Sequence, residues 1–233
     1  KRACGFIIEL RTIEQPGNAN QLKQFISGAY LQQPFSKLLL IGDYLQVPSI
    51  MRFGGASDPS YGYILGDDCY PEIQVGRISA ETIPELQTQL NRIMAYEKAI
   101  GMHHFDRFAG IASALGPGDN NEYDFEHLRG IGNQLMQVDY THFDELYDGS
   151  QGGTDLPGNP SPATLIHALN TGSGLLMYTG HGTRSTLSTT GFGIDDASSL
   201  SNQNQLPFVV SVACLNGDFV GGTCLAEALV RTE

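Results

Sequence analysis

Basic residues are scarce in this chain of 233 residues, with 13 Lys and Arg against 25 Asp and Glu and a formal net charge of −12. Proteins that bind a nucleic-acid backbone neutralise its phosphates with Lys and Arg, so this balance argues against a nucleic-acid partner. An acidic surface instead attracts cationic molecules such as basic peptides.

Long apolar runs are also missing. No run reaches the length of a membrane span, and the first one, residues 6–10, is too short for the core of a signal peptide. We therefore expect no membrane span and no signal peptide in this stretch. These features do not indicate where in or outside the cell the protein is located.

Cysteine is rare as well, and the four cysteines form no CxxC pair and no dense framework: Cys4, Cys69, Cys214 and Cys224. This pattern excludes a dense disulfide scaffold, and that absence does not decide the compartment. A Cys4–Cys69 disulfide stays open, because spacing alone does not place the two residues together.

Metal-binding side chains are few. Asp67 and Asp68 could help to bind calcium as a structural ion, although adjacent carboxylates in a glycine turn more often only form the turn. His103 and His104 follow a predicted helix, where the helix dipole alone favours histidine, and neighbouring residues do not converge on one ion. We expect no metal or other cofactor in the chemistry.

With 41% hydrophobic residues, the chain can bury a sizeable core. Apolar runs predict strands at residues 6–10, 37–41, 61–65, 73–78, 108–114, 138–143, 175–178 and 208–213. Helical patterns predict helices at residues 19–31, 79–100 (with Met94 in the core), 122–136, 161–169 and 223–230, and residues 48–60 and 147–160 read as loops. This alternation predicts an α/β fold, a three-layer α/β/α sandwich with a mainly parallel sheet.

Two of these runs, 175–178 and 208–213, read as buried strands, and each is followed by a reactive side chain, His181 or Cys214. Active sites of open parallel sheets lie at the carboxyl ends of strands. If the strands are parallel neighbours, an imidazole base and a thiol nucleophile emerge on the same edge, and the spacing of 33 positions from His181 to Cys214 leaves room for a crossover helix.

The glycines beside His181 offer freedom in φ and room for a substrate carbonyl. The backbone N–H groups of Gly182 and Cys214 are the nearest candidate donors to an oxyanion. A lone cysteine is usually a small buried hydrophobe and a lone histidine a structural residue, but the pair at matching strand ends is less ordinary.

These segments also carry a family resemblance. Residues 178–182 (YTGHG), 204–219 (NQLPFVVSVACLNGDF) and 224–231 (CLAEALVR) resemble the catalytic core of the gingipains, secreted cysteine peptidases with a caspase-like fold, and the arginine-specific members most. Looser similarity covers residues 38–43, 75–79 and 111–114. The resemblance implies a secreted or cell-surface endopeptidase that cuts protein or peptide substrates after a basic residue, with arginine favoured, through His181 and Cys214.

Asp124 has two interpretations. With Asn121 as the N-cap it would be the third residue of a helix, where a carboxylate is favourable. Residues 122–124 also resemble the gingipain segment whose aspartate lies at the base of the primary specificity pocket. A buried carboxylate there would bind a guanidinium through two charge-assisted hydrogen bonds.

One residue departs from the family pattern. Arginine-specific gingipains carry a glutamate that supports the catalytic histidine, and Leu115 stands at that position. Either another group, such as Asp119, Glu122 or a backbone carbonyl, orients His181, or the residues act as a bare dyad, which a cysteine nucleophile tolerates better than a serine.

We expect an N-terminal α/β subdomain over residues 1–104 and a catalytic caspase-like subdomain over residues 105–233. Family members continue beyond the corresponding point, so the resemblance implies a fragment or one chain of a processed assembly, with a second chain or further domain completing the fold. Two other functions stay open: a catalytically silent binding or secretion module, and a related transpeptidase.

Overall fold

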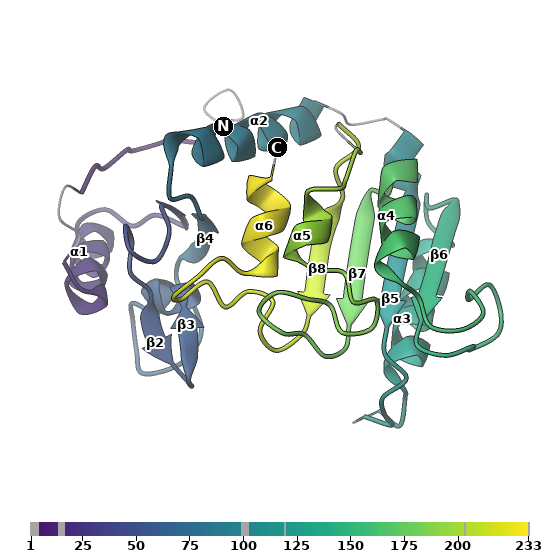
Figure 1. Ribbon diagram of the computed structural model, residues 1–233. Coiled ribbons are helices and arrows are strands. Elements are labelled where there is room, and N and C mark those ends of the chain that lie inside the picture. The colour runs from purple at the N-terminus through teal and green to yellow at the C-terminus, as the bar shows by residue number, and fades with distance from the viewer. Residues whose placement is uncertain (1–4, 14–16, 99–102, 119, 203, 233) are drawn as a thin grey trace. The chain divides into compact units, whose positions relative to one another are not determined.

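A computed structural model describes residues 5–13, 17–98, 103–118, 120–202 and 204–232 (Figure 1). The chain divides into two compact units, residues 1–79 and 80–233. Helix α2 (Ile83–Lys98) belongs to the second unit because it packs against α6 (Leu225–Arg231). The guanidinium of Arg92 donates to the carbonyl of Leu229 at 2.9 Å. The sequence led us to expect the boundary after residue 104, which would separate α2 from α6. The observed division instead lies after residue 79.

The N-terminal unit contains α1 (Ala19–Gln32) and two parallel strands, β1 (Lys37–Ile41) and β4 (Gln74–Ile78). These three elements confirm the predictions for them. Asn18 caps α1, since its side chain accepts from the N–H of Gln21 at 3.1 Å.

Two predictions in this unit are wrong. The segment read as a loop holds an antiparallel hairpin, β2 (Ile50–Arg52) and β3 (Gly55–Ser57). The strand predicted at residues 61–65 begins inside a 3₁₀ helix, η2 (Asp58–Gly62), where Tyr61 is fully buried and donates to the carbonyl of Pro48 at 2.5 Å. This contact holds the tyrosine in a turn.

Residues 6–10, also predicted as a strand, are not in a strand. Their apolar side chains are exposed, with Ile7 at 98% and Leu10 at 79%. A strand needs a partner for its backbone N–H and C=O groups, and no described strand pairs with this segment.

The second unit is built on a parallel sheet in the order β6 (His142–Tyr147), β5 (Arg107–Ala112), β7 (Leu175–Thr179), β8 (Phe208–Val212). The sequence predicted the start of β6 at residue 138, four residues before the strand begins. Asp139 adopts a positive φ of 26°, which a strand does not accommodate, so the chain turns there before β6 begins.

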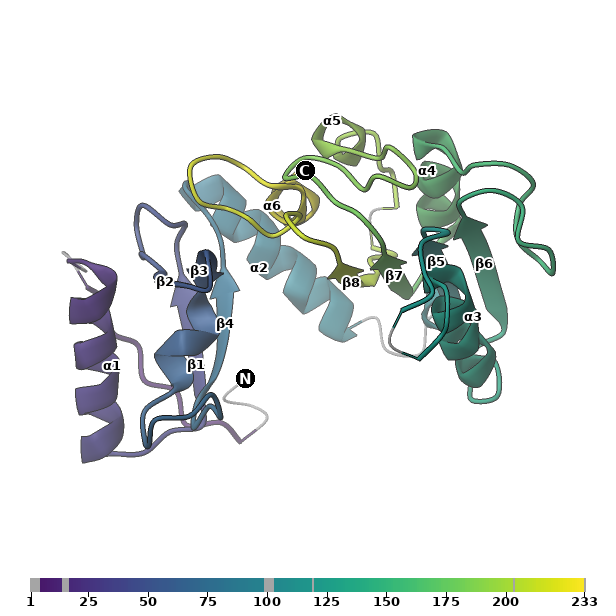
Figure 2. The same cartoon turned by 90° about the horizontal axis from the view of Figure 1, so that it is seen from below.

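Helices cover both faces of this sheet, which gives the predicted α/β/α layers (Figure 2). On one face α4 (Pro162–Thr171), α5 (Ile194–Ala197) and α6 pack on a core that includes Ile111, Leu176 and Tyr178. On the other face α3 (Asp124–Leu135) packs on a core that includes Phe108. Neighbouring residues of a strand therefore point to opposite layers, as the pleat requires.

Some apolar positions are less buried than the sequence predicted. Strand β8 lies at the edge of the described sheet, and Phe208 and Val212 are 60% and 58% exposed, because α3 contacts β5, β6 and β7. Met94, expected in the core, is 48% exposed, and the side of α2 that packs inward buries Gln89 instead.

The predicted cap of α4 is confirmed: Ser161 accepts from the N–H of Thr164 at 3.3 Å.

Candidate active site

The two predicted strands next to the reactive residues are parallel neighbours. Their last paired residues are Thr179 of β7 and Val212 of β8, and the N–H of Gly180 donates to the carbonyl of Val212 at 3.2 Å. His181 and Cys214 each lie two residues beyond this last pair, and both are exposed. The register therefore brings the imidazole and the thiol out at the same edge of the sheet.

His181 begins a tight hairpin. Its carbonyl accepts from the N–H of Ser188 at 3.0 Å and from the hydroxyl of the buried Tyr178, and the N–H of Thr183 donates to the carbonyl of Thr186 at 3.1 Å. The backbone of the histidine is thus held from two sides.

Gly182 lies between these two cross-hairpin hydrogen bonds, in a bridge with Leu187. At this non-hydrogen-bonded position of an antiparallel pair, a residue does not spend its own N–H on its partner. Within the described part of the chain, the N–H of Gly182 has no acceptor. It is therefore available to a ligand.

Gly182 is a glycine for reasons of space. Its φ lies outside the left-handed region, so the expectation that it needs unusual backbone freedom is wrong. A Cβ atom there would lie 2.7 Å from the side-chain nitrogen and oxygen of Asn216 and 2.8 Å from the Cβ of Ala213. The hairpin of His181 is therefore packed directly on the turn that contains Cys214.

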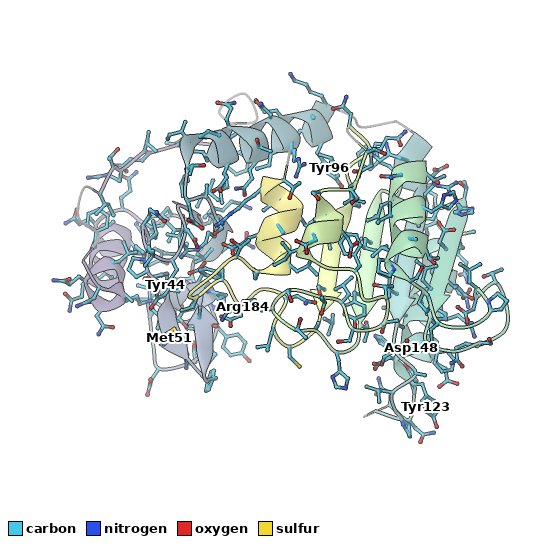
Figure 3. All side chains as sticks on the ribbon, in the orientation of Figure 1. Tyr44, Met51, Tyr96, Tyr123, Asp148 and Arg184 are labelled. Carbon is cyan, nitrogen blue, oxygen red and sulfur yellow. The ribbon has the colours of Figure 1, made fainter. Side chains whose placement is uncertain are left out.

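The turn after β8 holds Cys214. The N–H of Asp218 donates to the carbonyl of Leu215 at 3.0 Å, whereas no described group accepts from the N–H of Cys214. An ion pair of 2.5 Å between Arg184 and Asp218 joins this turn to the His181 hairpin. Figure 3 shows Arg184 near the end of the sheet where β7 and β8 finish.

Asp124 opens α3 as its first residue, with Tyr123 as the N-cap, so its expected place as the third residue is wrong. One of its carboxylate oxygens accepts from the hydroxyl of Ser113, a buried residue directly after β5. The N–H of Ser113 donates to the carbonyl of Thr179 at 3.0 Å. Two hydrogen bonds therefore connect Asp124 to the end of β7, two residues before His181.

The partly buried carboxylate of Asp124 has capacity left. No described residue donates to its second oxygen, Oδ1. A helix N-terminus also favours negative charge at this position. A cationic group arriving from solvent would meet a carboxyl group already held in place by Ser113.

The position of Leu115 offers His181 no acceptor, and the leucine is 48% exposed. Glu122 is engaged elsewhere, with Oε2 at 3.0 Å from Nδ1 of His127, and Asp119 lies outside the described residues. No described side chain or carbonyl is hydrogen-bonded to the imidazole of His181. Among the described residues, no third group therefore orients the ring of His181 through a hydrogen bond.

The metal candidates do not form a site in the described residues, which contain no group of three or more His, Cys, Asp or Glu arranged around one point. Asp68 accepts from the N–H of Tyr70 at 2.9 Å, the contact of a turn former. The side chain of His103 lies outside the described part, and His104 is buried beside Phe105, where desolvation lowers its pKa.

The other cysteines are not part of the candidate site. Cys69 is an exposed free thiol, and Cys4, its candidate disulfide partner, lies outside the described residues. Cys224 is a buried free thiol at the N-cap of α6, and burial raises its pKa to about 11.

None of the described helices is long and apolar enough to cross a membrane.

Comparison with known proteins decides the family. The model of peptidase family C25 matches residues 1–233. The chain belongs to peptidase family C25. Gingipain R2 of Porphyromonas gingivalis is 39% identical over 230 residues, and Lys-gingipain HG66 of the same organism is 25% identical over 182 residues.

Solved structures of this family have the same fold. The crystal structure of the Arg specific cysteine proteinase gingipain R (RGPB) superposes with a TM-score of 0.86 at 37% identity, over 95% of this chain and 51% of that chain. The family and caspase-like fold implied by the sequence motifs are therefore confirmed. The C25 chain spans about half of that solved protein, and 30% of gingipain R2 against 95% of itself.

Proposed function

We propose that this C25 chain carries the catalytic centre of a cysteine endopeptidase that cuts after a basic residue, with arginine favoured. The observation that carries the proposal is the register of β7 and β8, which delivers His181 and Cys214 two residues beyond the same hydrogen-bonded pair. The packing of Gly182 against Ala213 and Asn216 joins the two loops that bear them.

The reaction follows from these groups. His181 takes the thiol proton of Cys214, and the thiolate attacks the carbonyl carbon of the scissile peptide bond. The imidazolium returns the proton to the leaving amine as the C–N bond breaks, which leaves a thioester on Cys214. Water, deprotonated by His181, then hydrolyses the thioester and restores the free enzyme.

The negative charge that forms on the carbonyl oxygen needs donors. The N–H groups of Gly182 and Cys214 have no acceptor among the described residues and lie on the two loops that carry the dyad. Removal of one such donor typically costs about 10²–10³ in kcat. A valine at Gly182 would also collide with Asn216, so it would disturb the loops as well as the donor.

Asp124 supports the preference for a basic residue. Its second oxygen is free among the described residues, and Ser113 links it to the end of β7. A guanidinium and a carboxylate can form two charge-assisted hydrogen bonds, which a lysine ammonium cannot match in geometry. The superposed relative is an Arg specific cysteine proteinase, which agrees with this preference.

Secretion or display on the cell surface is part of the same proposal and rests on the resemblance to gingipains. Another superposed structure is a complex of the pro- and mature domains of RgpB of Porphyromonas gingivalis. A corresponding segment for this protein, like its peptide substrates, is a proposal.

The dyad is tested with Cys214→Ala and His181→Ala, assayed on arginyl and lysyl peptide amides. Both variants should lose turnover, while Cys69→Ser, which alters an exposed thiol of the N-terminal unit, should keep it. Alkylation of Cys214 by iodoacetamide should slow in His181→Ala, because the thiolate forms with help from the imidazole. Alkylation indifferent to His181→Ala would contradict the proposal and favour a silent module; transfer of the acyl group to an added amine would indicate a transpeptidase.

Asp124 is tested by Asp124→Asn against Glu126→Gln in the same first turn, where Glu126 accepts from the N–H of Tyr123 at 2.9 Å and from no other described group. Breaking a desolvated ion pair costs about 3–5 kcal/mol, and losing a helix-end charge about 0.3–1 kcal/mol. Asp124→Asn should therefore lower kcat/KM for arginyl substrates far more than it lowers Tm, and Glu126→Gln should affect only Tm. Intact arginyl hydrolysis in Asp124→Asn would return Asp124 to a capping role.

A further inference from the structure

Asn216 is a buried polar side chain between the two loops of the candidate active site. It stands two residues after Cys214, and only 3% of its surface is exposed. Its Nδ2 atom donates to the carbonyl of Thr183 at 2.6 Å and to the carbonyl of Thr186 at 2.9 Å, both in the hairpin that follows His181. Both donors of the amide are therefore spent on the histidine loop.

The remaining polar atoms of Asn216 are also in use. Its Oδ1 accepts from the hydroxyl of Ser211 in β8 at 3.0 Å, and its backbone carbonyl accepts from the N–H of Ala226 in α6 at 3.0 Å. One residue thus connects the cysteine turn, the histidine hairpin, the strand before the cysteine and the helix after it.

The chemistry of this position calls for an amide. Two carbonyl oxygens need two donors, and the hydroxyl of Ser211 needs an acceptor. Of the short side chains, only that of asparagine offers two donors and an acceptor on one rigid plane. An aspartate of the same shape would place a charged oxygen against two carbonyl oxygens in a buried site, which is strongly unfavourable.

The amide also sets a distance. The Nδ2 and Oδ1 atoms of Asn216 each lie 2.7 Å from the place that a Cβ of Gly182 would occupy. The side chain of Asn216 therefore fits against the backbone next to His181. A larger residue at either position would push the two loops apart. Contact and hydrogen bonds therefore fix the same spacing.

We propose that Asn216 is the positioning residue that sets the placement of His181 relative to Cys214, and with it the proton transfer that forms the thiolate. The proposal rests on the proposed function, since it concerns the same dyad. Catalysis is sensitive to such placement: a displacement of about 1 Å can cost roughly 10²-fold in rate.

The test compares Asn216→Asp with Ser211→Ala, which removes the donor to Oδ1 and leaves both bonds to the histidine hairpin. The rate of alkylation of Cys214 by iodoacetamide is followed from pH 5 to 10 by mass spectrometry of its peptide, with the exposed Cys69 as an internal reference. We expect the alkylation of Cys214 near neutral pH to slow in Asn216→Asp, as in His181→Ala, and to keep the wild-type rate in Ser211→Ala. On arginyl amides, Asn216→Asp should lower kcat about 10²-fold with KM little changed.

The outcomes separate this proposal from the proposed function. An Asn216→Asp protein with a wild-type alkylation profile and only a lower Tm would show a structural residue and overturn the positioning role. If the alkylation profile of Cys214 is the same in the wild type and in His181→Ala, the dyad itself is overturned. If circular dichroism shows that Asn216→Asp does not fold, Asn216→Ser, which keeps one donor without a charge, should shift the profile part of the way; no shift in this variant would likewise overturn the proposal.

Discussion

Two glycines of α3, only two residues apart, should respond in opposite directions to the same substitution. A Cβ at Gly130 would have no atom within 4 Å, so Gly130→Ala adds a better helix former at an exposed site. A Cβ at Gly132 would lie 2.1 Å from Cε1 and 2.4 Å from Cζ of Phe143. This ring is stacked on Phe108 with centroids 4.7 Å apart, which leaves it little room to move away.

The magnitudes follow from these distances. Alanine in place of glycine in a helix is favourable by about 0.5–1 kcal/mol, so Gly130→Ala should raise the free energy of unfolding by that amount. Gly132→Ala gains the same propensity but must displace a packed ring, and overpacking costs about 1–3 kcal/mol. We expect a net loss of about 1 kcal/mol or more, which is roughly 2–4 °C in Tm for a chain of this size.

The assay is urea and thermal unfolding of both variants, with hydrolysis of an arginyl amide as a second readout, because α3 carries Asp124 at its first residue. A shift of α3 in Gly132→Ala should lower kcat/KM, whereas Gly130→Ala should leave it unchanged. Adding Phe143→Leu, which removes the aromatic ring atoms at the contact, should recover part of the packing loss of Gly132→Ala. Stabilisation of the protein by both alanines would refute the packing of α3 described here.

Two further predictions concern buried titratable groups. Burial raises the pKa of Cys224 to about 11; in a Cys4→Ser protein at pH 8, a thiol reagent should therefore modify Cys69 and Cys214 and reach Cys224 only after unfolding, and modification of folded Cys224 would contradict its burial. Desolvation lowers the pKa of His104 in the folded protein, whereas in the unfolded chain it is about 6.5. Its neutral form thus stabilises the fold fully above about pH 6.5, and this contribution is lost as pH falls; urea titrations from pH 7.5 to 5 should show a smaller decline in His104→Leu, and an equal decline would disprove the role of His104.

Local signals in the sequence were enough for the elements that carry the site. The apolar runs before His181 and Cys214 are dense in β-branched and large residues, and both became strands with the expected neighbours. Ser161 and Pro162 marked the start of α4 because capping and a fixed proline φ act within one turn. The family motifs supplied the fold, since they cover the two loops at the sheet edge.

The failures share a physical cause, which is that burial and partners are set by contacts distant in sequence. An apolar run such as that of β8 predicts a strand but not whether a helix covers it, and Phe208 is 60% exposed. Residues 6–10 have strand propensity and no described strand to pair with. The role of Asn216 had only a weak signal, its place in the turn after Cys214, because its partners lie about 30 residues earlier in the chain.

The candidate site places its constraints on the backbone and leaves the reactive side chains free. The carbonyl of His181 is held by Ser188 and Tyr178, and its loop is held by Asn216, yet no described residue is hydrogen-bonded to its imidazole. A serine nucleophile would need a third residue to orient and charge that ring, but a thiol forms its ion pair with the imidazole at a far smaller cost. With Leu115 at the position of the family's glutamate, the ring can be oriented by Cys214 itself, provided that the two loops keep their spacing. If the proposed dyad operates, the packing of Gly182 on Asn216 takes the place of the carboxylate of a triad, through the position of the backbone rather than through a hydrogen bond to the ring.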